Sequence, residues 1–230
     1  EGYKKLLSMS EKIFDVGFTG LADKPFHSFI TMIKQVPHLV RLRCYRSVYQ
    51  LVSQYLKHDK LRQAFTIQPL LVGGNPFDTA SIYNLIHFLE RKWGIHYAMG
   101  GTGQVVRGLR QLMTEQGIEV RLDTTAKSFH LDGRHIKGIC LAGGEVLECD
   151  EVVSNMDPTF LYEKVIEKKS QPLLTRLRTR HAKLSMGLYV LYFGTNKKFH
   201  DVPHHTIWLG KRYQALLDDI FNKKVLADDF

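Results

Sequence analysis

The segment MGGTGQVVRGLRQLMTEQGIEVRLDTTAKSF, Met99–Phe129, joins a glycine-rich turn, a helix and the start of a β-rich region. Three of its first five residues are glycines, Val105–Gln116 follows with helical spacing, and Gly117 marks the next turn. A helix that starts after glycines can bind a phosphate group at its N-terminus. However, Val106 stands where a dinucleotide-binding fingerprint requires its third glycine. The spacing therefore favours a tight turn over a pyrophosphate site.

Upstream of this segment, the chain has the pattern of successive helices. Apolar residues recur at helical spacing over residues 1–14, 25–36, 39–55 and 81–93. Asp23 is placed to cap a helix that begins at Pro25. We expect Pro37 to interrupt the helical pattern and Gly94 to end the last helix.

Downstream of the segment, β-strands dominate the pattern. Strands are expected over residues 119–124, 151–156, 184–196 and 204–210, with a β-meander over 126–149. The hairpin turns of the meander are expected at Asp132-Gly133 and Gly143-Gly144. Asp157 can cap a helix opened by Pro158, and residues 211–223 predict a closing helix. The fold class is therefore α/β, of mixed α+β character.

The amino-acid composition restricts which kinds of site and which partners this chain can have. The chain carries 32 Lys and Arg against 23 Asp and Glu, a net charge of +9, which is typical either of a solvated surface or of an anionic partner. Its three cysteines form no C-x-x-C pair, which argues against a disulfide framework or a cysteine zinc site. No apolar run is long enough to span a bilayer.

Several short motifs occur in a fixed order along the chain. They are LVGGNPF (71–77), SIYNLIHFLE (81–90), GGTG (100–103), VVSNMDP (152–158), LYVLYFG (188–194), HHT (204–206) and KRYQALLDDIF (211–221). In this order they resemble the bacterial phytoene desaturases of the flavin amine oxidase superfamily. The resemblance covers essentially all 230 residues.

The resemblance implies a partial FAD-dependent oxidoreductase fold. It assigns residues 1–99 to a helical region for membrane or substrate access, 100–180 to the second segment of the FAD-binding domain, and 181–230 to the start of the substrate-binding domain. The chain starts in a helical pattern without a capping residue and lacks the family's pyrophosphate fingerprint. We therefore expect an internal segment of a longer polypeptide, inactive by itself.

The resemblance also implies an activity and a cofactor. The expected reaction is the FAD-dependent introduction of double bonds into a C40 carotenoid precursor, from phytoene towards lycopene. Ala126 matches the position where the family strand meets the adenine through backbone groups. Asn155 and Met156 match positions near the ribose and pyrophosphate, although the same residues also fit a simple strand-to-helix turn capped by Asp157. No residue is assigned as the catalytic acid or base.

A hydrocarbon substrate must be bound by apolar area, at roughly 25 cal/mol per Å². Either a substrate tunnel or ordinary core packing explains the aromatic residues Phe65, Phe77, Tyr83, Phe88, Tyr189, Tyr192 and Phe193. Asp218 and Asp219 are interpreted as an exposed helix face rather than an acid–base pair. His204 and His205 are adjacent in an expected strand and would point to opposite faces, so no metal site is expected.

Basic residues surround an apolar stripe between residues 41 and 62. They are Arg41, Arg43, Arg46, Lys57, Lys60 and Arg62. Such a pattern suits an anionic bilayer surface, and the lipophilic substrate makes peripheral association with the inner face of a bacterial cell membrane the expected location. Nucleic acid is not expected as a partner, because no recognised module is present and the charge is diffuse. The oligomeric state is not indicated by the sequence.

Two alternatives remain open at this point. One is a related flavin oxidoreductase, namely a diapophytoene desaturase, a carotenoid isomerase or an amine oxidase. The other is a non-catalytic module that uses its basic helices to bind a membrane surface or a nucleic acid.

Overall fold

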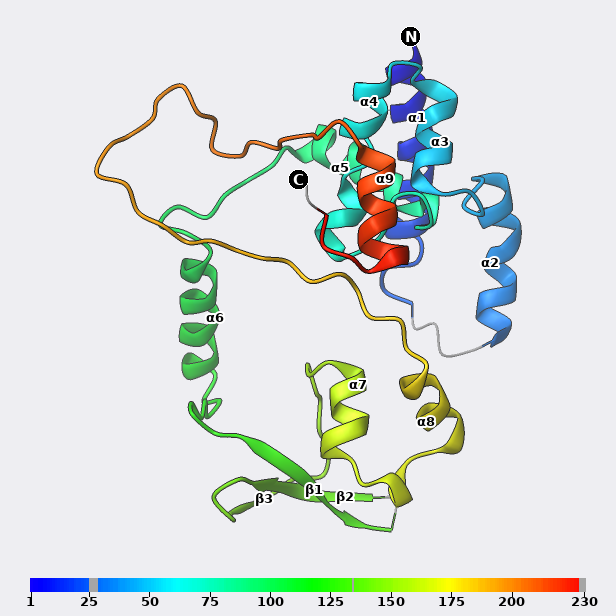
Figure 1. Cartoon of the computed structure of the whole chain (residues 1–230). Coiled ribbons are helices and arrows are strands. Elements are labelled where there is room, and N and C mark those ends of the chain that lie inside the picture. Colours follow the sequence, from blue (N-terminus) through cyan, green and yellow to red (C-terminus); the bar gives the residue numbers. More distant parts are fainter. Residues whose placement is uncertain (25–28, 134, 228–230) are drawn as a thin grey trace. The chain divides into compact units, whose positions relative to one another are not determined.

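The computed structural model describes residues 1–24, 29–133 and 135–227 (Figure 1). The chain divides into two compact units, the first made of Glu1–His96 with Ser185–Phe230 and the second of Tyr97–Leu184. The functional division expected at residues 99/100 and 180/181 differs slightly from these structural boundaries and stays a prediction.

The first unit is helical, as its apolar stripes predict. Its α-helices are α1 (Gly2–Phe14), α2 (Phe29–Arg41), α3 (Val48–Tyr55), α4 (Asp59–Ala64), α5 (Leu85–Trp93) and α9 (Tyr213–Asp218). Shorter 3-10 helices cover Gln68–Val72 and Ser81–Asn84, and π-helical turns cover Asp15–Thr19 and Asp219–Lys223. Gly94 ends α5 with φ 78°, which confirms its predicted role. The expected start of α2 at Pro25 lies outside the described residues.

The core of the first unit lies between α1 and α3. Leu6 and Ile13, two turns apart on α1, are fully buried, and so is Leu51 on α3. Full burial of such a side chain stabilises the fold by about 1.5–3 kcal/mol. A capping box fixes the start of α3, because the Ser47 side chain accepts from the Gln50 N–H and the Gln50 side chain accepts from the Ser47 N–H.

Pro37 does not interrupt the helix, which corrects the sequence prediction. Helix α2 continues through Pro37 to Arg41. Proline removes one backbone N–H donor, but the turn after it keeps its backbone hydrogen bonds. For example, the Leu42 N–H donates to the His38 carbonyl at 3.0 Å. Leu42 and Cys44 then enter the core, so burial just beyond the proline helps to hold the helix in place.

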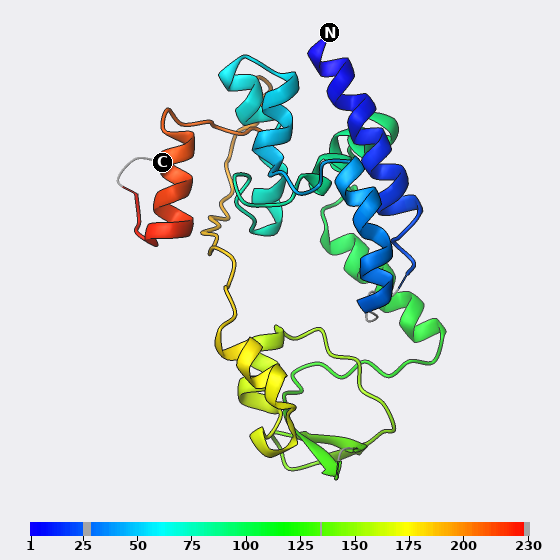
Figure 2. The ribbon, with the colours of Figure 1, turned by 90° about the vertical axis from the view of Figure 1, so that its right-hand side faces the viewer.

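The second unit contains a small antiparallel sheet and helices. Its elements are α6 (Gly103–Glu115), β1 (Ala126–Asp132), β2 (His135–Leu141), β3 (Val146–Glu148), α7 (Pro158–Phe160), a π-helical turn (Leu161–Val165), a 3-10 helix (Lys168–Ser170) and α8 (Leu173–Arg180). The strands pair in the order β1-β2-β3. Gly133 and Gly144 have φ of 61° and 90°, which confirms the two predicted hairpin turns. Helices α7 and α8 lie next to one another over one face of the sheet (Figures 1 and 2).

Four predicted strands are not strands in the structure. Residues 119–124, 151–156, 184–196 and 204–210 form no ladder among the described residues. A strand depends on hydrogen bonds to a neighbour, and a pattern of β-branched and aromatic residues does not by itself supply that neighbour. The apolar side chains of Leu188–Phe193 are accordingly between 49% and 90% exposed.

Candidate functional site

The glycine-rich turn before α6 uses its own backbone groups. Gly100 and Gly101 have φ of 82° and 93°, in the region that favours glycine. A Cβ at Gly100 would also lie 2.8 Å from the Gln104 Nε2 atom. The N–H groups of Gln104 and Val105 donate to carbonyls of the turn itself, at 3.0 Å each. These two donors are therefore engaged within the turn, and the segment folds as the tight turn that its spacing favours.

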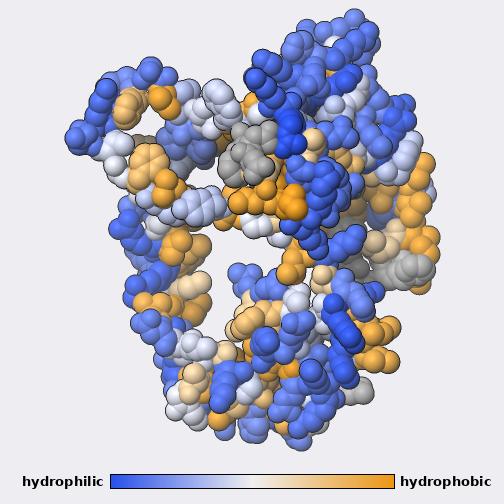
Figure 3. All heavy atoms as spheres, viewed as in Figure 1, coloured by the Kyte–Doolittle hydropathy of each residue, from blue (hydrophilic) through white to orange (hydrophobic). Residues whose placement is uncertain are grey.

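Helix α6 presents an apolar face that nothing in its unit covers. None of its residues is buried. The exposed apolar side chains are Val105, Val106, Leu109, Leu112 and Met113. Hydrophobic side chains line this helix in the space-filling view (Figure 3). Contiguous exposed apolar surface of this kind is typical of contact surfaces.

The predicted flavin-contacting residues lie on two segments of the second unit. Ala126 is the first residue of β1, is half-buried and pairs with Leu141 on β2. Asn155 and Met156 are exposed in the extended segment before α7, where the Met156 N–H donates to Ser154 Oγ at 3.2 Å. Among the described residues, no hydrogen bond joins Ala126 to either of them. Their contact with a flavin stays a prediction.

The strand-to-helix turn after Met156 is capped as the sequence predicts. The Asp157 Oδ1 atom accepts from the Phe160 N–H at 3.0 Å, and Pro158 occupies the first helical turn. The cap formed by Asp157 does not exclude a ligand next to it. The neighbouring Asn155 side chain is exposed and forms no hydrogen bond among the described residues, so it is available to one.

The first strand, β1, has one edge open to other partners. This strand lies at the edge of the sheet, since it pairs with β2 on one side. An edge strand keeps one row of backbone N–H and C=O groups for other partners. Backbone groups of this kind can recognise a ligand whatever the side chain is, so the predicted adenine contact at Ala126 does not depend on the identity of that side chain.

Arg121 holds the segment before β1 against the hairpin between β2 and β3, a feature that the sequence reasoning missed. Its guanidinium contacts Glu119 at 2.7 Å and Glu145 at 2.8 Å. The hydrogen bonds to Glu145 and Glu119 raise the pKa of Arg121 further above its ordinary value. The side chains are exposed, so these pairs add little stability and serve mainly to position the segment.

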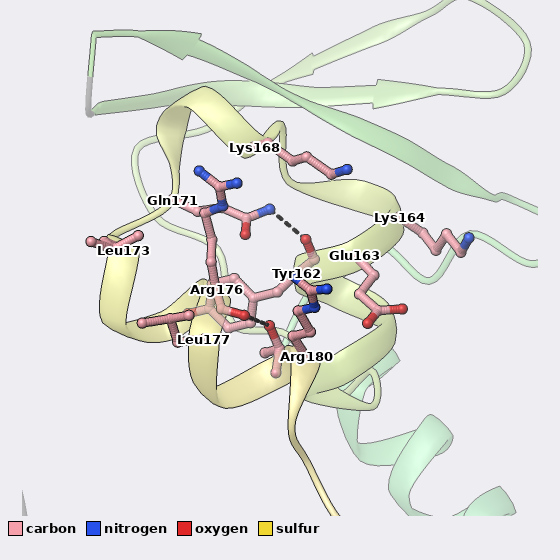
Figure 4. Close-up of a pocket in the computed structure, with 10 residues that line it drawn as sticks. Tyr162, Glu163, Lys164, Lys168, Gln171, Leu173, Arg176, Leu177 and Arg180 are labelled. Atoms are coloured by element: carbon pink, nitrogen blue, oxygen red, sulfur yellow. Dashed lines mark hydrogen bonds between the residues drawn. The ribbon is translucent and has the colours of Figure 1, made fainter.

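A second missed feature is a basic pocket of about 380 Å³ in the second unit (Figure 4). It is lined by Tyr162, Glu163, Lys164, Lys168, Gln171, Leu173, Arg176, Leu177, Thr179 and Arg180. The signal for it was in the sequence, because residues 160–184 carry seven Lys and Arg against two Glu. That imbalance supplies more than half of the chain's net charge of +9.

The seven aromatic residues considered for a substrate tunnel are not brought together. Phe65 and Phe88 pack inside the first unit, against His87 and Phe14. Tyr192 is 90% exposed. Among the described residues, no ring contact joins two of the seven. The core-packing interpretation accounts for the half-buried Phe65 and Phe88. The substrate tunnel stays a prediction.

Two other expectations are corrected. Asp219 is buried rather than exposed, and its hydrogen bond from Lys223, with support from Arg212, lowers its pKa. Asp219 is thus ionised near neutral pH and poorly suited to donate a proton.

His204 and His205 lie in a bend, where strand alternation does not apply, and their Nδ1 atoms are 2.8 Å apart. Across the described residues, no three His, Cys, Asp or Glu side chains gather into a possible metal site.

The basic residues near α2 have different surroundings. Arg43 donates to Gln54 Oε1 at 2.7 Å, and Arg46 lies 5.8 Å from the ring of Tyr45. Arg41 is exposed at the end of α2. Within the ranges that the structure describes, no helix has both the length and the apolar character needed to cross a bilayer.

Comparison with known proteins gives a consistent result. The family model for flavin containing amine oxidoreductases matches residues 36–224. The chain is 40% identical over 230 residues to a lycopene-forming phytoene desaturase of Pseudescherichia vulneris, covering 100% of this chain and 47% of that protein. It is 39% identical over 230 residues to the corresponding enzyme of Pantoea ananas, with the same coverage. A neurosporene-forming phytoene desaturase of Cereibacter sphaeroides is 36% identical over 231 residues, covering 99% of this chain and 45% of that protein. The chain thus spans about half the length of these relatives.

Proposed function

The chain belongs to the flavin containing amine oxidoreductase family, and from this premise we propose that the protein is an FAD-dependent phytoene desaturase. The observation that carries the proposal is the 36–40% identity along essentially the whole chain to three enzymes named for this reaction. Identity is higher to the two lycopene-forming enzymes than to the neurosporene-forming one. We therefore propose phytoene as the substrate and lycopene as the main product.

The proposed reaction removes two hydrogens across a carbon–carbon single bond of a C40 polyene. One hydrogen would leave as a hydride, for which bound FAD would be the acceptor, and the other would leave the neighbouring carbon as a proton. No side chain can accept a hydride in this way. In the proposed site, the open edge of β1 at Ala126 would bind the adenine end, and Asn155 and Met156 would lie along the ribose and pyrophosphate. The Arg121 contacts with Glu119 and Glu145 support this role by holding the preceding segment beside the sheet.

We further propose that the protein works at the inner face of the bacterial cell membrane, where a lipophilic substrate would be taken up. Helix α2 supports this idea through its exposed apolar face, which consists of Ile30, Ile33, Val36 and Val40. These residues recur at helical spacing, and the exposed Lys34 and Arg41 flank them. A helix with an apolar face and cationic flanks can lie in the interface of an anionic bilayer.

The reaction is tested by expressing the complete gene product in bacterial cells that accumulate phytoene, followed by extraction and chromatography of the pigments. The expected result is loss of phytoene and appearance of lycopene. Unchanged phytoene in cells that contain the folded, flavin-loaded protein would refute the substrate. Oxidation of an amine by the same preparation would instead favour the amine oxidase alternative.

The membrane proposal has a separate test in vesicle flotation. The Ile33→Glu variant places a charge on the exposed face of α2 and should reduce flotation with anionic vesicles. Ile118→Glu is the matched control, because Ile118 is 55% exposed in the second unit, outside that face and outside the basic region between residues 41 and 62. Equal flotation of both variants and the parent protein would remove α2 from the membrane proposal.

A further inference from the structure

The basic pocket of the second unit lies between two structural walls. One wall is the π-helical turn Leu161–Val165 with the 3-10 helix Lys168–Ser170, and the other is α8. Figure 4 shows that the side chain of Arg176 extends from α8 toward Gln171, and that of Arg180 toward Glu163. Two guanidinium groups on successive turns of one helix thus reach toward the same hollow.

The charges of this pocket are not balanced within the described part of the chain. Its lining includes the cations Lys164, Lys168, Arg176 and Arg180, against the single carboxylate of Glu163. Among the described residues, none of these four cations forms an ion pair. The contrast is local, because Lys169 immediately beside the pocket is paired with Glu167 at 2.7 Å. Like charges gathered at one hollow repel each other, so an anion bound there would lower the electrostatic energy.

The side chains of Gln171 and Thr179, two neutral polar residues of the pocket, are already used by its frame. The Gln171 amide donates to the carbonyls of Tyr162 and Ile166, the latter at 2.6 Å, and ties the loop before α8 to the π-helical turn. The Thr179 hydroxyl donates to the Thr175 and Arg176 carbonyls at 3.1 Å each. Recognition of a ligand is therefore left mainly to the guanidinium and ammonium groups. Arginine pairs in a bidentate manner with phosphate oxygens, which makes phosphate the matching anion.

We propose that this pocket binds the phosphate group of a phosphorylated ligand, with Arg176 and Arg180 as the principal contacts. The proposed desaturation needs no such site, because its hydrocarbon substrate carries no phosphate. The phosphate can belong to a free phosphate compound or to the headgroup of an anionic phospholipid. The second source is compatible with the rim, where Leu173 and Leu174 of α8 are 67% and 73% exposed. Hydrophobic and strongly hydrophilic side chains lie next to each other over α8 in Figure 3.

The test compares the double variant Arg176→Gln/Arg180→Gln with Arg178→Gln in the purified protein. Arg178 lies on the same helix but does not line the pocket, so it controls for general loss of charge. Calorimetric titration with inorganic phosphate and pyrophosphate probes the free source. Flotation with phosphatidylcholine vesicles, with and without phosphatidylglycerol, probes the lipid source.

The double variant should bind at least about tenfold more weakly in one of these assays, because it loses two charged groups that donate to the phosphate, while Arg178→Gln stays within about twofold of the parent. Loss confined to titration assigns a free phosphate compound, and loss confined to vesicles assigns a lipid headgroup. Equal effects of both variants, or binding in neither assay, would overturn the proposal.

Two further measurements keep the test independent of folding and of the flavin. Lys168→Gln changes the opposite wall without touching α8, and it should also weaken binding while circular dichroism stays unchanged. Flavin content is measured in every variant of the complete gene product. A double variant that loses FAD would show that the pocket belongs to the flavin site, which overturns this inference and leaves the proposed desaturase function intact.

Discussion

Acidification should destabilise the first unit through one buried histidine, His87. Its Nε2 atom lies 2.9 Å from the Phe65 carbonyl, and its Nδ1 atom lies 3.2 Å from the Gln68 amide nitrogen. A carbonyl can only accept, so Nε2 carries the proton and Nδ1 accepts from Gln68. This arrangement satisfies the neutral ring and leaves no acceptor for a second proton.

The size of the stability loss on acidification follows from the pKa of His87. Burial lowers that pKa from 6.5 to about 4, against the opposing effect of the hydrogen bond with the Phe65 carbonyl. Between these two values the unfolded chain binds more protons than the folded one, so stability falls as the pH falls. Lowering the pH from about 7 to about 5 should cost about 2 kcal/mol, and the full loss, reached below pH 4, should be about 3 kcal/mol.

Urea unfolding, followed by circular dichroism at a series of pH values, measures this effect. The His87→Phe variant removes the titrating ring, and the His130→Gln variant removes an exposed histidine as a matched control. His87→Phe should be less stable than the parent at pH 7 but should lose less stability on acidification, whereas His130→Gln should follow the parent curve. Parallel curves for His87→Phe and the parent would refute the assignment of the acid sensitivity to His87.

Three substitutions test the packing and the turns. Leu51→Ala should lower the free energy of unfolding by about 2–5 kcal/mol, measured by urea titration, because Leu51 is fully buried. Gly138→Val should lower the thermal midpoint of the second unit, because a Cβ there would lie 2.5 Å from the Leu147 carbonyl oxygen; an unchanged midpoint would contradict this close approach. Asp157→Ala should cost about 1 kcal/mol through loss of the cap, with Asp157→Asn as the control that keeps most of it.

The local parts of the fold could be predicted from the sequence. The buried faces of α1 and α3 are formed by residues three and four positions apart, so the apolar stripes in the sequence were sufficient to predict these helices. The glycine turns also depend on local backbone conformation, and Gly133 and Gly144 lie where the sequence predicted them. Pro37 was misjudged because the strength of the flanking contacts, from Leu42 and Cys44, is tertiary information.

The non-local parts could not be predicted in the same way. Strand formation over residues 184–196 requires a pairing partner, which the pattern of that segment cannot supply. The flavin-contacting residues came from resemblance alone, since nothing in the chemistry of Ala126 distinguishes it from other strand residues. The basic pocket was missed because Lys168 and Arg176 belong to different elements, and their approach depends on the loop held by Gln171.

The segment Gly187–Gly194 has a consequence for handling the protein. It contains no charge and no proline, and its large side chains are between 49% and 90% exposed. Uncharged β-prone stretches of this length recruit copies of themselves into cross-β aggregates when they lack a pairing partner. Concentrated preparations should therefore precipitate with thioflavin-positive material, and Val190→Lys should delay that precipitation.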